Sequence, residues 1–277
     1  MGEENKTLPA GIILACTWRP HGELSRLLRA LLLLRQAYSG IALALPPDVD
    51  TAQALLLQDI IGSTPIITGD WAHGRHAALQ KALELPGGHI HYADMDRLLH
   101  WLEVNPEEWR QTLAAIRRAD CLIIGRTERA WATHPLAMQE TERSINNIFS
   151  SLLGRPVDLG GGSRIFSRPA AMCLLAYSPP GNAPGTDAAW PVLLQRAGFS
   201  VDYLAVDGLE WEVPDRQTGQ AGDEETRRRA AAAYDEDIAH WLRCASLALE
   251  IIQAGLEASR REIPLRAEHW REQARMM

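Results

Sequence analysis

Residues 89–96 read His-Ile-His-Tyr-Ala-Asp-Met-Asp, an apolar run that ends in two carboxylates one residue apart. Residues i and i+2 of an extended chain point to the same side, so Asp94 and Asp96 are expected to converge on one ligand. Open parallel sheets bind ligands beyond the carboxyl ends of their strands. Carboxylate oxygens suit Mg²⁺ or Mn²⁺, so the pattern predicts a divalent cation site. The alternative is that Asp94 caps a helix beginning near Met95, with Asp96 on its surface.

Short apolar runs alternate with helical patterns on both sides of this stretch. The alternation is typical of the α/β class and predicts a mostly parallel sheet with helices on both faces. Strands are expected at residues 11–17, 41–45, 65–68, 89–93 and 121–125, and within 158–166. Helices are expected at residues 23–38, 51–60, 71–83, 105–118 and 136–153, and in two later segments that end near 176 and 198.

The last part of the chain has a different pattern. Residues 214–223 are polar and are expected to be flexible, and the chain from 224 onward is expected to be helical. We therefore divide the chain into an α/β domain at 1–213, which carries the candidate site, and a helical extension at 214–277. Large side chains in the extension recur at steps of three and four, which predicts one apolar stripe that either packs on the sheet or forms a subunit interface. We favour a homodimer contact. The stripe comprises Tyr234, Ile238, Trp241, Leu242, Ala245, Leu249, Ile252 and Leu256.

Composition excludes several classes of protein. A net charge of −7 and a pI near 5.7 argue against a general nucleic-acid binder, which needs a basic face. Four separated cysteines without a Cys-x-x-Cys pair predict a reduced, cytoplasmic protein. Residues 1–8 are polar and do not resemble a signal peptide. No run approaches the roughly 20 apolar residues of a membrane span, so no transmembrane segment is expected.

Five further motifs surround the paired aspartates in a fixed order. They are Thr17-Trp18-Arg19-Pro20 before a leucine-rich helix, Asp48 and Asp50 after the second strand, Gly74-Arg75-His76-Ala77-Ala78, Asp120 to Arg126, and Asp158 with Gly162 to Arg168. This order resembles the family-2 glycosyltransferases, a group with the GT-A fold, over about residues 10–207. Pro46-Pro47 interrupt the acidic motif of the second strand. No Gln-x-x-Arg-Trp-like signature is present, so a processive polysaccharide synthase is not expected.

The resemblance implies transfer of a sugar from a nucleoside-diphosphate sugar to an acceptor oxygen. The acceptor is open, either a small molecule or a lipid phosphate. The resemblance implies a role for each matching residue. Asp96 would bind the cation directly, and Asp94 would contact ribose or the cation through water. Arg75 would stand near the diphosphate, and Asp187 would be the base. Thr17 and Arg19 would line the nucleoside pocket, with Asp48 as the nearest acidic contact.

Several of these residues also have ordinary structural interpretations. Asp187 begins a helix, where the helix dipole by itself favours an acid. Gly160 to Gly162 form either a simple turn or a close approach to a ligand. Trp190 and the segment Gly208 to Glu212 offer aromatic rings and carboxylates to a sugar, but tryptophan more often lies in the core.

Three other functions compete with glycosyl transfer. A strand that ends in Asp-x-Asp is also typical of haloacid dehalogenase-type phosphatases, but these need a downstream lysine and none follows Lys81. A nucleotidyltransferase would need a glycine-rich, lysine-bearing opening loop, which is missing. A non-catalytic GT-A domain that binds a nucleotide-sugar or a partner stays open, because the motif after the second strand is altered.

Overall fold

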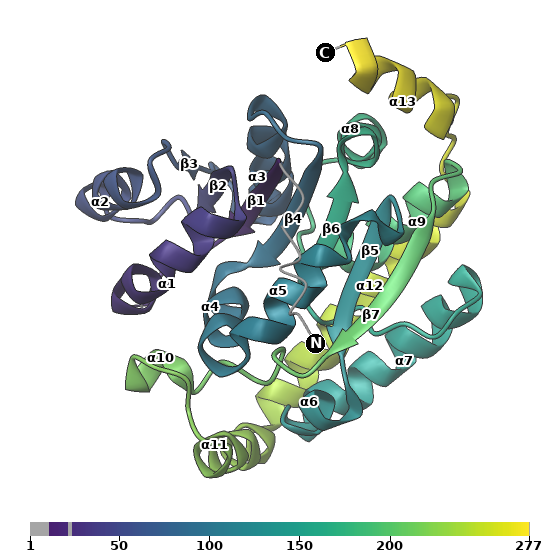
Figure 1. Cartoon of the computed structure of the whole chain (residues 1–277). Coiled ribbons are helices and arrows are strands. Elements are labelled where there is room, and N and C mark those ends of the chain that lie inside the picture. The colour runs from purple at the N-terminus through teal and green to yellow at the C-terminus, as the bar shows by residue number, and fades with distance from the viewer. Residues whose placement is uncertain (1–10, 22–23, 277) are drawn as a thin grey trace, which may run out of the picture.

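A computed structural model describes residues 11–21 and 24–276 and has a seven-stranded sheet at its centre (Figure 1). The strand order is β3-β2-β1-β4-β6-β5-β7, and only β6 runs antiparallel to its neighbours. The mostly parallel α/β sheet expected from the sequence is therefore confirmed. The expected helix start at Glu23 and the polar residues 1–8 lie outside the described residues. The strands are β1 (Ile12–Thr17), β2 (Gly40–Leu45), β3 (Ile66–Ile67), β4 (His89–Asp94), β5 (Cys121–Arg126), β6 (Ser163–Ser167) and β7 (Val201–Val206).

Helices cover both faces of the sheet, and each face has its own apolar cluster (Figure 1). One face packs against α1 (Leu24–Ala37), α2 (Thr51–Ile61), α4 (Met95–Val104) and α5 (Pro106–Ala114). The other packs against α3 (Gly74–Glu84), α7 (Leu136–Leu153), α8 (Arg168–Tyr177), α9 (Thr186–Arg196) and α12 (Ile238–Arg260). The shorter or peripheral elements are η1 (Trp71–His73), η2 (Ile116–Arg118), α6 (Glu128–Ala132), α10 (Asp215–Thr218), α11 (Glu224–Glu236) and α13 (Ala267–Met276).

Local sequence explains where several helices begin and end. Asn105 caps α5 by accepting a hydrogen bond from the backbone N–H of Glu108, and Pro106 occupies the first turn. The sequence predicts one helix to residue 118, but α5 ends at Ala114 and η2 follows. Gly154 closes α7 in the left-handed conformation that glycine adopts without strain.

Helix α12 buries a different face from the one that the sequence predicts. Apart from Ile251, its buried residues are small, and Gly255 lies so close to α7 that an added Cβ would stand 2.2 Å from the Phe149 ring. Most of the large stripe faces outward, with Leu242 71% and Leu249 56% exposed. The expectation that this stripe might pack on the sheet is not met, because close helix packing selects small side chains. The domain boundary at residue 213 stays a prediction.

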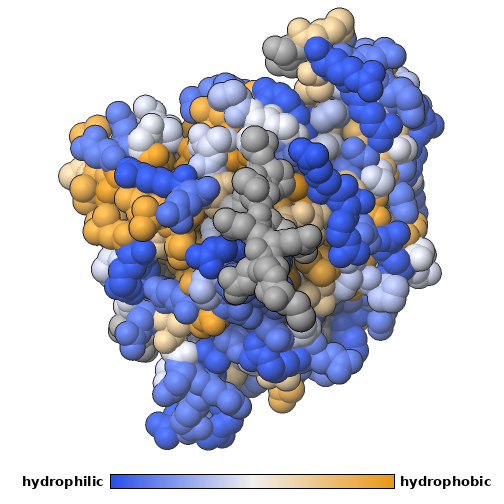
Figure 2. Space-filling view, in the orientation of Figure 1, coloured by the Kyte–Doolittle hydropathy of each residue, from blue (hydrophilic) through white to orange (hydrophobic). Residues whose placement is uncertain are grey.

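A second apolar patch lies over α1 and α2 (Figure 2). It comprises the exposed residues Leu28, Leu32, Leu55 and Leu56. Among the described helices, none combines the length and the apolar character that crossing a bilayer requires.

Candidate functional site

A cleft of about 700 Å³ opens at the carboxyl ends of β1 and β4. Its lining contains the predicted residues Thr17, Arg19, Arg75, Asp94 and Asp96. Neighbouring parallel strands bring these segments together, since Thr17 and Asp94 are direct partners across β1 and β4. A cleft of this volume is of the size that binds small molecules and cofactors.

Asp94 is held by a compact set of donors. Its Oδ1 accepts hydrogen bonds from the Tyr92 hydroxyl at 2.6 Å and the Thr17 hydroxyl at 3.1 Å. Its Oδ2 lies 3.2 Å from Nη2 of Arg75. The side chain makes no capping bond to α4, so the interpretation of Asp94 as a helix cap is wrong. Asp94 instead belongs to the cleft wall.

The charge on Asp94 is stabilised despite its burial. Burial raises the pKa of the carboxyl, but the nearby charges of Arg75 and Arg97 and the two hydroxyl hydrogen bonds outweigh it. The net result is a pKa below the ordinary value for aspartate. Asp94 is therefore an anion at neutral pH.

Asp96 lies two residues further along the chain, in the first turn of α4. Its Oδ1 accepts a hydrogen bond from the backbone N–H of Arg97, and its Oδ2 lies 2.9 Å from Nη2 of Arg216. The Asp96 side chain is 23% exposed and reaches the cleft. A ligand at Asp96 must therefore compete with an arginine that is itself partly exposed.

Arg75 joins the cleft to Asp187. The guanidinium lies 2.5 Å from Oδ1 of Asp187 as well as 3.2 Å from Asp94, and it is largely buried. Asp187 also lies 2.9 Å from Nη2 of the buried Arg164. One arginine thus bridges the two aspartates to which the sequence analysis gives different roles. Asp187 itself lines a second, smaller cavity rather than the cleft.

Arg19 and Asp48 form an exposed pair at the rim. Their side chains meet at 2.6 Å, and the Arg19 guanidinium also lies 5.8 Å from the centre of the Trp71 ring. A hydrogen bond from Arg19 lowers the pKa of Asp48. Asp48 thus contacts the cleft through Arg19.

The remaining sequence candidates divide between core and site. Trp190 is fully buried in the core, so its interpretation as a sugar-stacking ring is wrong. Gly162 has a positive φ of 64°, and a Cβ there would stand 2.7 Å from Oδ2 of Asp94. This position therefore needs glycine to let the chain pass the aspartate.

The segment after β7 supplies two residues of the cleft: Glu212, from the segment that the sequence analysis offers as a source of carboxylates, and Arg216, which it does not name. Glu212 lies 3.6 Å from Nε of Arg97, and its buried Oε2 has no hydrogen-bond partner among the described residues. Burial raises the pKa of Glu212 above its ordinary value, and nearby Asp96 adds to that rise. Arg216 follows at the start of α10, within the stretch expected to be flexible.

A buried charge network fixes this segment to α4. The His100 ring, which has no exposed surface, lies 2.6 Å from Asp215 and 3.3 Å from Glu210. Arg26 also contacts Asp215 at 2.8 Å. Asp215 is completely buried, so the expectation of a flexible 214–223 segment is wrong at this residue. The network holds Glu212 and Arg216 at the cleft.

We expect the stability that this network contributes to fall as pH rises. Burial lowers the pKa of His100, but hydrogen bonds to Asp215 and Glu210 outweigh it, so the folded-state pKa is raised. The contribution is therefore full below the unfolded value near 6.5 and is lost as pH passes the higher folded value. His100→Gln should cost about 1.5–3 kcal/mol at pH 6, the contribution of hydrogen bonds to charged groups, and less at pH 9. Urea unfolding checks this, with half-exposed His73→Gln as the control; an equal cost at both pH values contradicts it.

Solved structures of other proteins share the fold of this chain. No family model and no curated protein matches the chain. A crystal structure of Mycobacterium tuberculosis glucosyl-3-phosphoglycerate synthase matches 94% of this chain and 85% of its own at 9% identity, with a TM-score of 0.55. The same synthase with Mn²⁺, UDP-glucose and phosphoglyceric acid gives 9% identity, 94% and 84% coverage, and a TM-score of 0.55. The chain has a GT-A glycosyltransferase fold. A structure described as a mycobacterial protein matches at 12% identity, 94% and 78% coverage, and a TM-score of 0.55.

The GT-A fold brings most of the predicted site together. Thr17, Arg19, Arg75, Asp94 and Asp96 line one cleft. The sequence analysis did not name Arg97 or Arg164 as site residues, although both lie in motifs that it describes. Arg97 directly follows Asp96, and Arg164 belongs to the Gly-Ser-Arg motif. Glu212 belongs to the segment that the sequence analysis offers as a source of carboxylates for a sugar, whereas Arg216 and Arg243 lie in no such motif and reach the cleft through tertiary packing.

Proposed function

We propose that this protein transfers a sugar from a nucleoside-diphosphate sugar to an acceptor oxygen. The observation that supports it best is the Arg75 bridge, which places Asp94 of the cleft next to Asp187. Five arginines line the cleft and suit a diphosphate, whose oxygens accept charge-assisted hydrogen bonds. These are Arg19, Arg75, Arg97, Arg216 and Arg243.

Residues in the cleft also fit a divalent cation, Mg²⁺ or Mn²⁺. Asp96 is the direct ligand in this proposal, because Asp94 already receives three protein hydrogen bonds. The described residues contain no cluster of three or more His, Cys, Asp or Glu side chains arranged to hold a metal ion. Mg²⁺ commonly keeps several waters and uses one or two carboxylates plus substrate phosphates, so a small protein ligand set is sufficient. When bound, the cation neutralises charge on the departing diphosphate.

The reaction forms one bond and breaks one bond at the anomeric carbon. The acceptor oxygen bonds to that carbon while the bond from the carbon to the diphosphate oxygen breaks. Asp187 takes the hydroxyl proton, and the arginines of the cleft stabilise the charge that develops on the diphosphate. An acceptor that is already ionised, such as a lipid phosphate, needs no base.

Asp96→Ala should abolish metal-dependent nucleotide binding while preserving the fold. The side chain is partly exposed and pairs with an exposed arginine, so its loss should change stability by less than about 1 kcal/mol. Calorimetry with UDP, with and without Mn²⁺, measures the effect. Asp59→Ala, on the exposed side of α2, is the matched control. Unchanged UDP affinity in the presence of Mn²⁺ would refute the metal assignment.

The donor base can be identified by thermal shift with UDP-, GDP- and dTDP-sugars. A ligand at one hundred times its Kd stabilises the folded state by about 2.7 kcal/mol. Binding without turnover on any acceptor would favour the alternative function, a non-catalytic nucleotide-sugar-binding protein. The salt bridges that already occupy Asp94 and Asp96 are the observation that keeps this alternative open. We propose a cytoplasmic location for either function.

We also propose that the protein forms a homodimer through α12. Its exposed stripe repeats at steps of four and three, the spacing of a coiled-coil seam, so a second copy of the same helix is a suitable partner. Leu242→Glu combined with Leu249→Glu should convert a dimer into a monomer in light scattering. Leu28→Glu, in the separate patch over α1, is the control. A monomeric wild-type protein would end the dimer proposal.

A further inference from the structure

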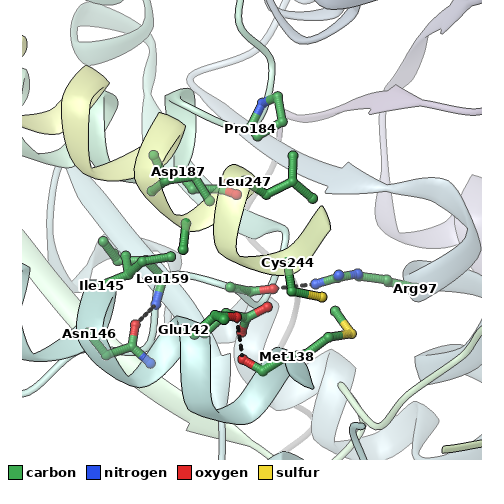
Figure 3. Close-up of a pocket in the computed structure, with 14 residues that line it drawn as sticks. Arg97, Met138, Glu142, Ile145, Asn146, Leu159, Pro184, Asp187, Cys244 and Leu247 are labelled. Carbon is green, nitrogen blue, oxygen red and sulfur yellow. Dashed lines mark hydrogen bonds between the residues drawn. The ribbon is translucent and has the colours of Figure 1, made fainter. Parts of the chain in front are cut away.

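A second cavity of about 150 Å³ lies beside the cleft, between α7, α9 and α12 (Figure 3). Arg97, Pro184 and Leu247 line both spaces, so the cavity adjoins the cleft at these residues. Asp187 lines the second cavity and contacts the cleft through Arg75. The proposed base therefore stands between the two spaces.

Most of the cavity wall is apolar. Its apolar side chains include Met138, Ile145, Leu159, Leu247, Ala248 and Ile251. An apolar cavity of about 150 Å³ has room for a molecule of the size of benzene. The space therefore accommodates about six carbon atoms.

The polar groups of the wall are already engaged by other protein groups. The Asn146 amide donates to Asp158 at 3.0 Å and accepts from the backbone N–H of Leu159 at 2.9 Å. Glu142 pairs with Arg126, and Arg97 donates to the Gly160 carbonyl. An occupant consequently finds few unused polar partners here, which favours an apolar group.

The charge of the wall disfavours an anion. The carboxylates of the wall, Glu142 and Asp187, are already paired with arginines outside it. The guanidinium of the wall, Arg97, is engaged by the Gly160 carbonyl and lies near Glu212, so it is not left over to pair with an anionic occupant. The synthase with the same fold was crystallised with phosphoglyceric acid, which is an anion. The cavity wall of this chain is thus unsuited to a ligand of that charge.

We infer that this cavity binds the apolar part of a neutral acceptor alcohol and holds its hydroxyl near Asp187. The inference rests on the proposed glycosyl transfer and specifies its acceptor class as a small hydroxylated molecule with a group of about six carbons. The acceptor hydroxyl oxygen forms the new bond to the anomeric carbon, the diphosphate leaves, and the proton passes to Asp187.

Direct binding of two probes to the full-length protein tests the inference. Calorimetry should detect cyclohexanol in the wild-type protein, and cyclohexanecarboxylate should bind at least tenfold more weakly. Ala248→Phe, on the buried side of α12, fills the cavity and should weaken cyclohexanol binding at least tenfold. Ala245→Phe, on the exposed side of the same helix, is the matched control and should leave the affinity unchanged.

A second variant tests the cavity from the opposite direction. Ile251→Ala enlarges the space and should improve the affinity for 4-methylcyclohexanol at least tenfold. Absence of cyclohexanol binding in the wild type, tighter binding of the carboxylate, or a folded Ala248→Phe protein with wild-type affinity would each overturn the inference. UDP titration with Mn²⁺ on the same samples separates the two proposals. If the wild-type protein binds UDP but not cyclohexanol, only the acceptor cavity is refuted. If the wild-type protein does not bind UDP in the presence of Mn²⁺, the proposed function is refuted.

Discussion

Asp187→Asn is expected to lower turnover about 10²–10⁴-fold while leaving nucleotide affinity nearly unchanged. The amide keeps the shape of the carboxylate but cannot accept the acceptor's proton. Asp187 does not line the cleft in which the donor is proposed to bind, so its effect should fall on kcat rather than on donor binding.

The measurement compares kcat and UDP affinity in wild type and variant, with the unfolding free energy as a check on the fold. That check matters because Asp187 also neutralises Arg75 and Arg164. Thr186→Val, at the neighbouring residue that accepts a hydrogen bond from Arg75, is a suitable control for altered Arg75 contacts. Wild-type turnover in Asp187→Asn on the true acceptor would show that the base lies elsewhere.

Arg75→Met is expected to destabilise the fold by about 3–5 kcal/mol at pH 7, because it leaves two largely buried carboxylates without their shared cation. Those are Asp94 and Asp187. Burial opposes the charge of Asp94, and Arg75 is the largest single influence that lowers its pKa. A lowered folded-state pKa contributes stability above the unfolded value near 3.8 that is lost as pH falls below it.

The difference between wild type and Arg75→Met should therefore shrink as pH falls toward and below 3.8. Urea unfolding at pH 7, and at a pH below 3.8 such as pH 2.5, measures both predictions. Arg143→Met is the control, since Arg143 forms an exposed pair on α7 and should change stability by less than about 0.5 kcal/mol. If Arg75→Met lowers the free energy of unfolding by less than about 1 kcal/mol, the pairing of Arg75 with the two aspartates does not stabilise the fold.

Part of the site could be predicted because it depends on local order along the chain. An apolar strand ends at Asp94, and parallel strands place their carboxyl ends at one edge, so the position of Asp94 and Asp96 follows from the pattern around residue 90. Thr17 is predictable for the same reason, since it ends the neighbouring strand. These features depend on where each apolar strand ends and on the short turn that follows it.

Other features depend on contacts between segments far apart in the sequence. Arg75 and Asp187 are 112 residues apart, and no local pattern in either segment identifies the other as its partner. The placement of Glu212 and Arg216 depends on the buried partners of His100, which anchor a segment that looks polar and flexible in the sequence. A charged residue that is paired inside a protein has the same sequence signature as one in solvent.

The sequence by itself determined the mostly parallel sheet, the edge at which the site forms and the pair of aspartates there, because strand alternation and chain direction suffice for these. Only the tertiary structure decided which face of α12 is buried. Besides the predicted stripe of large side chains, α12 has a second face with the same spacing, which contains Ala248 and Gly255 and consists mostly of small residues. The close approach of α7 at Phe149 leaves room only for the small stripe, so the large one faces solvent. That choice is set by the distance between helices, which no periodicity in a single helix encodes.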